Sequence, residues 1–137
     1  MNLLIDTNVL LDMVFTRNDY EKAMTLFKVI RESNSRAFVS ASAVTDLFYI
    51  IRRETHDTAK TYSIMENIFK LIEVVSVTER DIYTAFTKQW KDFEDCVQYT
   101  VAERNDMDYF VTSNQKDFED GAIMVVSPEK CVEILTA

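Results

Sequence analysis

Short, uninterrupted apolar runs alternate along the chain with longer stretches in which apolar residues recur every three or four positions. A short uninterrupted run is typical of a strand that is buried on both faces of a parallel sheet. We predict strands near residues 3–5, 37–39, 73–77, 109–112 and 123–126. The recurring pattern between these runs is typical of amphipathic helices.

The predicted helices have start signals as well as apolar faces. Thr78 and Asp81 form a loose capping box, and Pro128 stands at the first position of the last helix. We predict helices over about 18–31, 41–53, 57–72, 78–90 and 93–104, and from residue 127 onward. Strands separated by helices favour an α/β fold, a three-layer α/β/α sandwich with a central, mainly parallel sheet. In such sheets, ligands bind at the carboxyl ends of the strands.

Length and composition fit one domain that covers residues 1–137. The sequence has 137 residues and is 47% hydrophobic, so it can bury a sizeable core. It contains no apolar stretch long enough to span a membrane and no recognisable signal peptide. We therefore expect a cytoplasmic protein that does not bind membranes.

The rare residue types narrow the possible chemistry. Gly121 is the single glycine, which excludes a P-loop and a dinucleotide-binding fingerprint. The single histidine, His56, lies in a polar stretch, and the chain has no nucleophile elbow for a serine hydrolase. Cys96 and Cys131 are too few for a zinc site and are expected to be small buried residues. The net charge of −8 argues against a sequence-reading DNA-binding protein, but not against a nuclease whose site is acidic.

Carboxylate and amide side chains stand beside several predicted buried segments. Asp6 directly follows the first strand, Asp46 and Asp95 border apolar helix faces, and Asn114 and Asp117 follow a later strand. Each has an ordinary structural explanation: a helix cap, the edge of an apolar stripe, a first-turn acid or a polar turn. Their convergence on one sheet edge, with no His or Cys among them, favours a site for a hard cation, Mg²⁺ or Mn²⁺.

Three neighbours of these residues complete the prediction. The amide of Asn8 can orient a carboxylate or a water molecule. Asp92 is placed to cap the helix that carries Asp95. Glu94 is expected to point away from the face of Asp95 and to be solvated.

Four segments in order carry a resemblance to a known family. They are residues 4–12 (LIDTNVLLD), 40–46 (SASAVTD), 92–98 (DFEDCVQ) and 109–118 (YFVTSNQKDF). With these segments the chain resembles a PIN-domain ribonuclease, of the kind found as the VapC-like toxins of toxin–antitoxin pairs. The resemblance implies phosphodiester hydrolysis of RNA at carboxylates that hold one or two Mg²⁺ or Mn²⁺ ions.

The resemblance also assigns roles to residues. It implies that Asp6, Asp46 and Asp95 are catalytic and hold the metal, with Asn114 or Asp117 in the fourth position. The choice between those two stays open. Thr7, Asn8 and Thr112 are expected to hold carboxylates or water in place. Asp46 stands where many relatives have the longer Glu, and Ser113 where many have Arg.

The resemblance extends to partners: an RNA substrate, a small antitoxin and a second copy in a homodimer. The main alternative is a PIN-like module that docks a protein or RNA partner without cleaving it, which Ser113 and Asn114 favour. A haloacid-dehalogenase-type phosphatase is a weaker alternative, because Asn8 occupies the place of its second aspartate. A response-regulator receiver is also weak, because Lys116 is not at a strand end.

Overall fold

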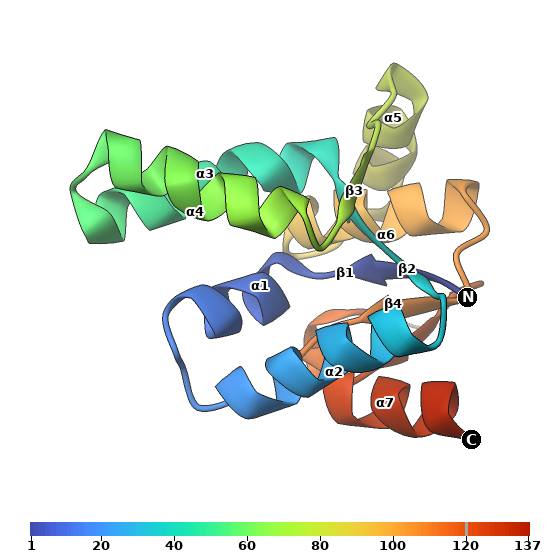
Figure 1. Cartoon of the computed structure of the whole chain (residues 1–137). Coiled ribbons are helices and arrows are strands. Elements are labelled where there is room, and N and C mark those ends of the chain that lie inside the picture. Colours follow the sequence, from blue (N-terminus) through green and yellow to red (C-terminus); the bar gives the residue numbers. More distant parts are fainter. Residues whose placement is uncertain (120) are drawn as a thin grey trace.

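A five-stranded parallel sheet lies at the centre of the chain (Figure 1). The computed structural model describes residues 1–119 and 121–137. In this part the strands are β1 (Asn2–Ile5), β2 (Arg36–Ser40), β3 (Glu73–Val75), β4 (Tyr109–Val111) and β5 (Met124–Val126). The helices are α1 (Thr7–Val14), α2 (Tyr20–Glu32), α3 (Ala41–Thr55), α4 (Thr58–Phe69), α5 (Glu79–Lys88), α6 (Phe93–Arg104) and α7 (Pro128–Thr136), with a 3₁₀ turn, η1, at Gln115–Asp117.

The first strand of the sequence is the central strand of the sheet. The strand order is β3-β2-β1-β4-β5, and every pair is parallel. Leu4 of β1 is in register with Phe38 of β2 on one side and with Phe110 of β4 on the other. The carboxyl ends of β1 and β4 therefore lie next to each other. The predicted α/β sandwich is confirmed, and the sheet is wholly parallel where we predicted a mainly parallel one.

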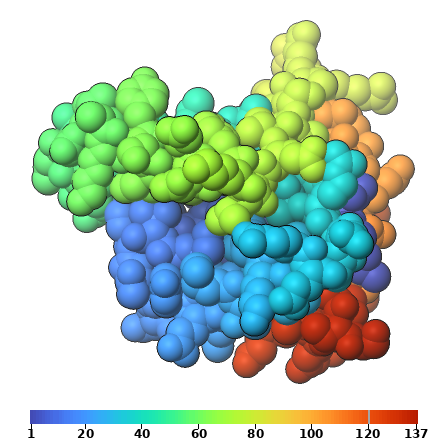
Figure 2. Space-filling view, viewed as in Figure 1, coloured from blue at the N-terminus to red at the C-terminus, as the bar shows by residue number. Residues whose placement is uncertain are grey.

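Helices cover both faces of the sheet. Leu3 and Ile5 pack into a core with residues of α1, α2, α3 and α7, whereas Leu4 between them packs into a second core with α6. This alternation is expected for a strand buried on both sides. The α3–α4 hairpin extends beyond the sheet as an arm (Figures 1 and 2).

The predicted strands and helices are present and differ from the structure at their ends, whereas α1 (Thr7–Val14) is not among the predicted helices. The strand predicted over 73–77 ends at Val75, and the helix predicted to reach residue 72 ends at Phe69. The capping box is complete, because Thr78 and Asp81 each accept a hydrogen bond from the other's backbone N–H. Cys96 and Cys131 are buried free thiols, as predicted.

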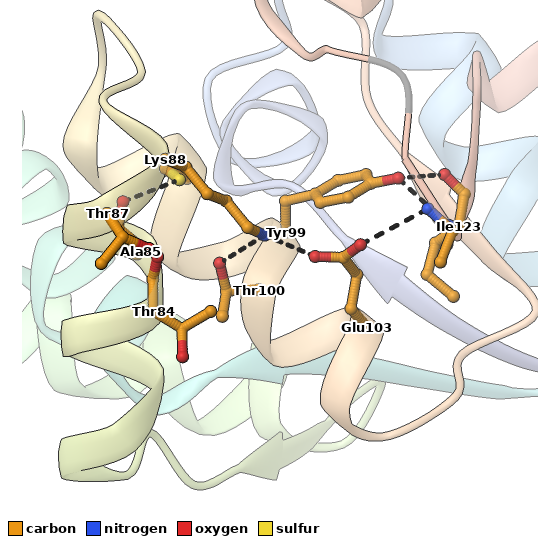
Figure 3. Close-up of polar contacts among 10 residues, drawn as sticks. Thr84, Ala85, Thr87, Lys88, Tyr99, Thr100, Glu103 and Ile123 are labelled. Atoms are coloured by element: carbon orange, nitrogen blue, oxygen red, sulfur yellow. Dashed lines mark hydrogen bonds and ion pairs between the residues drawn. The ribbon is translucent and has the colours of Figure 1, made fainter.

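Polar contacts connect helix α6 to α5 and to Ile123, next to β5 (Figure 3). The Tyr99 hydroxyl donates to the carbonyl oxygen of Ile123 and accepts a hydrogen bond from its N–H. Lys88 of α5 forms an ion pair with Glu103 of α6. A Cβ on Gly121 would lie 2.7 Å from the Tyr99 hydroxyl oxygen, so this position needs glycine. These contacts fix the helix whose first turn carries Asp95.

No helix in residues 1–119 and 121–137 combines the length and the apolar character that crossing a membrane requires.

Candidate active site

Asp6 lies at the carboxyl end of β1, where it is 2% exposed. Its backbone N–H donates to the carbonyl oxygen of Val111 at 2.9 Å, which extends the β1–β4 ladder to this residue. The Thr112 hydroxyl donates to Asp6 Oδ2 at 2.7 Å and accepts a hydrogen bond from the Asn114 N–H at 3.0 Å. The two adjacent strand ends therefore hold the Asp6 carboxylate in one orientation.

The ordinary explanation of Asp6 as a helix cap accounts for only part of its environment. It occupies the N-cap position of α1, but its side chain makes no capping hydrogen bond, although the N–H groups of Thr7 and Asn8 favour its charged form. Burial raises the pKa of Asp6 more than the hydrogen bonds of Thr112 and Gln98 lower it. None of the ion pairs in residues 1–119 and 121–137 includes Asp6. A buried carboxylate without a cationic partner is costly to keep charged.

Asp6 faces a cavity of about 370 Å³. Its walls come from the end of β1 with the start of α1, from α3 and from the first turns of α6. We call it the acidic cavity; it is lined by Asp6, Thr7, Asn8, Asp46, Tyr49, Ile50, Asp92, Glu94, Asp95 and Gln98. Asp6, Asp46 and Asp95, which are far apart in the sequence, thus line one cavity. Their roles there stay a prediction.

The start of α6 places two acids in this cavity. Asp92 caps the helix by accepting a hydrogen bond from the Asp95 N–H at 2.9 Å, as predicted. Burial, followed by the charges of Asp6, Asp92 and Asp117, raises the pKa of Asp95 to about 7. Burial, followed by Asp46 and other acids, also raises the pKa of Glu94 to about 7. Both values reflect like charges crowded into a half-buried space.

The prediction that Glu94 is solvated is wrong. Its Oε1 atom is buried, has no hydrogen-bond partner among the described residues, and belongs to a side chain that lines the acidic cavity. Residues 94 and 95 diverge on the helix, yet both side chains line the acidic cavity. The sequence signal is Gln98, a polar residue one turn after Glu94 in a run of buried residues.

Gln98 and Thr7 are further polar residues at the cavity whose oxygen atoms have no partner. Gln98 is 1% exposed, and its Oε1 is buried and unpartnered among the described residues. The Thr7 Oγ1 atom is in the same situation. Buried acceptors without donors are rare in folded proteins and call for an explanation. Sequence reasoning missed Gln98 altogether.

The fourth predicted position lies outside the acidic cavity. Asp117 is exposed on η1 and lines a neighbouring cavity of about 530 Å³ together with Asp92 and Asp95. Asn114 is half-buried and lines neither cavity. Ser113 donates to Asp12 Oδ2 at 3.4 Å, on the side of α1. Asp117 shares the neighbouring cavity with Asp95, and its charge contributes to the raised pKa of Asp95.

Comparison with known proteins identifies the family. A model of the PIN domain family matches residues 2–116. The chain belongs to the PIN domain family. Ribonuclease VapC1 of Aquifex aeolicus (strain VF5) is 22% identical to this PIN domain over 135 residues, which cover 94% of this chain and 92% of that protein.

Solved structures share the fold. VapBC2 from Rickettsia felis, bound to a DNA fragment from its promoter, contains a chain that superposes on this PIN domain with a TM-score of 0.72 and 12% identity. The match covers 93% of this chain and 98% of that one. VapC20 from Mycobacterium tuberculosis, a Sarcin-Ricin loop cleaving toxin, gives a TM-score of 0.61 and 13% identity, covering 79% and 86% of the two chains.

The residues of this PIN domain fit a hard divalent cation. The acidic cavity offers carboxylate, amide and hydroxyl oxygens and contains no His or Cys, which is the donor set that Mg²⁺ and Mn²⁺ prefer. Its unpartnered buried acceptors suit a hydrated cation, whose water molecules donate hydrogen bonds. Among residues 1–119 and 121–137, however, no three acidic, His or Cys side chains are close enough to hold a metal as they stand. The acids would have to rotate toward a shared cation.

Proposed function

We propose that the chain is a divalent-metal-dependent endoribonuclease and the toxin of a toxin–antitoxin pair. One observation carries the proposal: Asp6, 2% exposed and without a basic partner, faces a cavity that also contains Asp46 and Asp95. Purely structural acids are normally exposed or paired. Membership of the PIN domain family and the similarity to a protein named Ribonuclease VapC1 support a nuclease.

The residues of the cavity have distinct tasks in this proposal. Asp6 is fixed by the Thr112 hydroxyl, and Asp46 and Asp95 approach it from α3 and α6. These three carboxylates hold the cation, and Thr7 and Asn8 orient water at its rim. When bound, Mg²⁺ or Mn²⁺ supplies Lewis-acid stabilisation of phosphate charge and lowers the pKa of a water molecule. No histidine base is needed, and His56 is exposed at the far end of α3.

The neighbouring cavity of about 530 Å³ gives the RNA strand a path away from the acids. It shares Asp92 and Asp95 with the acidic cavity and is also lined by Trp90, Lys91 and Lys116. Lysines bind phosphate groups, and an aromatic ring can stack on a base whatever its identity. In this proposal the RNA backbone passes Lys91 and Lys116, and Asp117 contributes to the metal site from this side.

Partners are also part of the proposal. A solved relative is a complex named VapBC2, and another is described as a toxin–antitoxin complex from Klebsiella pneumoniae, so a small antitoxin protein is a natural inhibitor. The exposed apolar residues Ile82, Tyr83 and Phe86 of α5 support a homodimer. We place the protein in the cytoplasm, where its RNA substrates are.

RNA cleavage with a defined metal requirement tests the enzyme proposal. We expect the purified chain to cut single-stranded RNA with Mg²⁺ or Mn²⁺, and to be inactive with EDTA. The Asp6→Asn/Asp95→Asn variant should lose this activity. Glu32→Gln/Glu66→Gln, which removes the same number of charges from two exposed positions, should retain it. Equal activity in the first variant and the wild type would falsify the catalytic proposal and leave a PIN domain that binds its partner without cutting it.

A further inference from the structure

Glu94 and Asp46 line the acidic cavity from two different helices. Glu94 is on the first turn of α6, Asp46 is in the first half of α3, and the two helices pack against each other. Both side chains line the acidic cavity, and among the neighbouring charges Asp46 acts most strongly on Glu94. Two neighbouring carboxylates repel each other, and a cation bound between them removes this repulsion.

The usual explanation for an acid in a first turn does not account for the buried Oε1 atom of Glu94. Such an acid interacts with the helix dipole and with free N–H groups, and it stays in contact with water. Glu94 Oε1 instead is buried and accepts no hydrogen bond from any described residue. A carboxylate oxygen in this position needs a cation or a donor that the chain itself does not provide.

Gln98 gives independent support. It lies one turn after Glu94 on the same side of α6, is 1% exposed, and lines the same cavity with an unpartnered Oε1. An amide oxygen has no charge, so repulsion among acids does not explain its isolation. It is suited to accept a hydrogen bond from water around a cation, or to contact the cation directly.

Side-chain length gives a reason for a second acid from α6 in addition to Asp95. Asp46 is exposed on α3, and an aspartate reaches one methylene less far than a glutamate. We propose that Glu94 is a further ligand of the divalent cation, and that it supplies from α6 the reach that Asp46 lacks on α3. Gln98 holds water beside it. This inference rests on the proposed metal-dependent function, and it adds a residue to the predicted acids.

Calorimetric titration with Mn²⁺, without RNA, tests this assignment. We expect Glu94→Gln to weaken Mn²⁺ binding about tenfold or more, the effect typical of a ligand or its close support. Glu66→Gln, which removes the same charge from the exposed face of α4, should bind like the wild type. The double variant Asp46→Glu/Glu94→Gln should bind more tightly than Glu94→Gln, because the longer acid at position 46 restores the lost reach.

Thermal melting measures the effect of a substitution on folding, and Mn²⁺ binding and RNA cleavage measure its effect on function. In EDTA, Glu94→Gln should melt at the same temperature as the wild type or higher, because it removes a repelling charge. If Glu94→Gln and Glu66→Gln bind Mn²⁺ equally well while the wild type still cleaves RNA with Mn²⁺, the role of Glu94 is refuted and the proposed function stands. If the wild type neither binds Mn²⁺ nor requires a divalent metal for cleavage, both proposals are refuted.

Discussion

Asp6 and Asp81 are both 2% exposed, yet their environments are opposite. Asp81, on α5, accepts hydrogen bonds from Arg104 and from the Thr78 backbone N–H. Burial raises its pKa, but these partners outweigh burial and the net pKa is lowered. Asp6 has hydroxyl and amide neighbours but no cation, and its pKa is raised.

The difference shows how a structural acid can be told from a functional one. Burial alone does not distinguish them, because both side chains are inaccessible to solvent. The distinguishing feature is whether the fold itself supplies the opposite charge. Asp81 is paired with a cation of the chain itself, whereas Asp6 has no such partner among the described residues, and we propose that a bound cation takes this place.

The largest effect is expected at Asp6. Asp6→Asn should reduce RNA cleavage about a thousandfold, because an amide cannot replace the carboxylate in holding a cation. The same variant should be at least as stable as the wild type in EDTA, since it removes an unpaired buried charge. Cleavage of a labelled RNA and thermal melting measure the two quantities. Loss of stability together with activity would place Asp6 in the structural class.

Asp81 should show the reverse pattern. Asp81→Ala leaves Arg104 without its partner and removes the capping box, so we expect a loss of about 3 kcal/mol in the free energy of unfolding. RNA cleavage by the folded variant, measured well below its melting temperature, should stay within about twofold of the wild type. Glu79→Ala, an exposed acid in the same helical turn, is the matched control and should cost less than about 0.5 kcal/mol.

The Thr112 hydroxyl, which donates to Asp6, tests whether the orientation of this carboxylate matters for metal binding. Thr112→Val keeps the shape of the side chain but removes the donor to Asp6 Oδ2. We expect Mn²⁺ affinity to fall about tenfold in calorimetry, because the carboxylate loses its orientation and its pKa rises further. Thr112→Ser retains the hydroxyl and should bind Mn²⁺ nearly as well as the wild type. Equal affinities for the valine and serine variants would argue against this positioning role.

The smallest effect is the pH dependence of stability without metal. The pKa values of Glu94 and Asp95 are raised to about 7, so between their ordinary values and about 7 the folded chain binds more protons than the unfolded one. Both side chains are half-buried, and solvent screens their charges, so we expect the free energy of unfolding to fall by only about 1 kcal/mol as the pH rises through this window in EDTA. Asp95→Asn should make this decrease of the unfolding free energy with pH smaller, as measured by denaturant titrations at several pH values. Mn²⁺ should also make the decrease smaller. Asp81 acts oppositely: its lowered pKa gives stability that is lost only in strong acid.

Much of this arrangement follows from local sequence. The apolar run at residues 3–5 predicts a buried parallel strand, and its abrupt end at Asp6 places a carboxylate at the ligand-binding edge of the sheet. Thr112 is the last residue of the strand predicted over 109–112, so its position at the same edge is predicted for the same reason, whereas its role beside a carboxylate came from the family resemblance. Helix caps such as Thr78 and Asp92 are equally local and are predicted correctly.

The burial of Glu94 in the cavity could not be predicted from local sequence. Helical periodicity assigns a residue to a face of its own helix, and on that basis Glu94 diverges from Asp95. Whether that face meets water depends on how α3 packs against α6, which is a tertiary contact between residues far apart in the sequence. The same limit applies to Asn114 and Asp117, whose positions depend on the loop geometry after β4.

The central position of β1 has a consequence for how the protein is made. Asp6 is synthesised before its donor Thr112, which lies 106 positions later in the sequence, and β4 must dock on β1 before the two meet. A polypeptide that stops short of β4 therefore lacks the donor that orients Asp6, and under the proposed function the ribosome that makes it is not exposed to an active nuclease before β4 has emerged and docked.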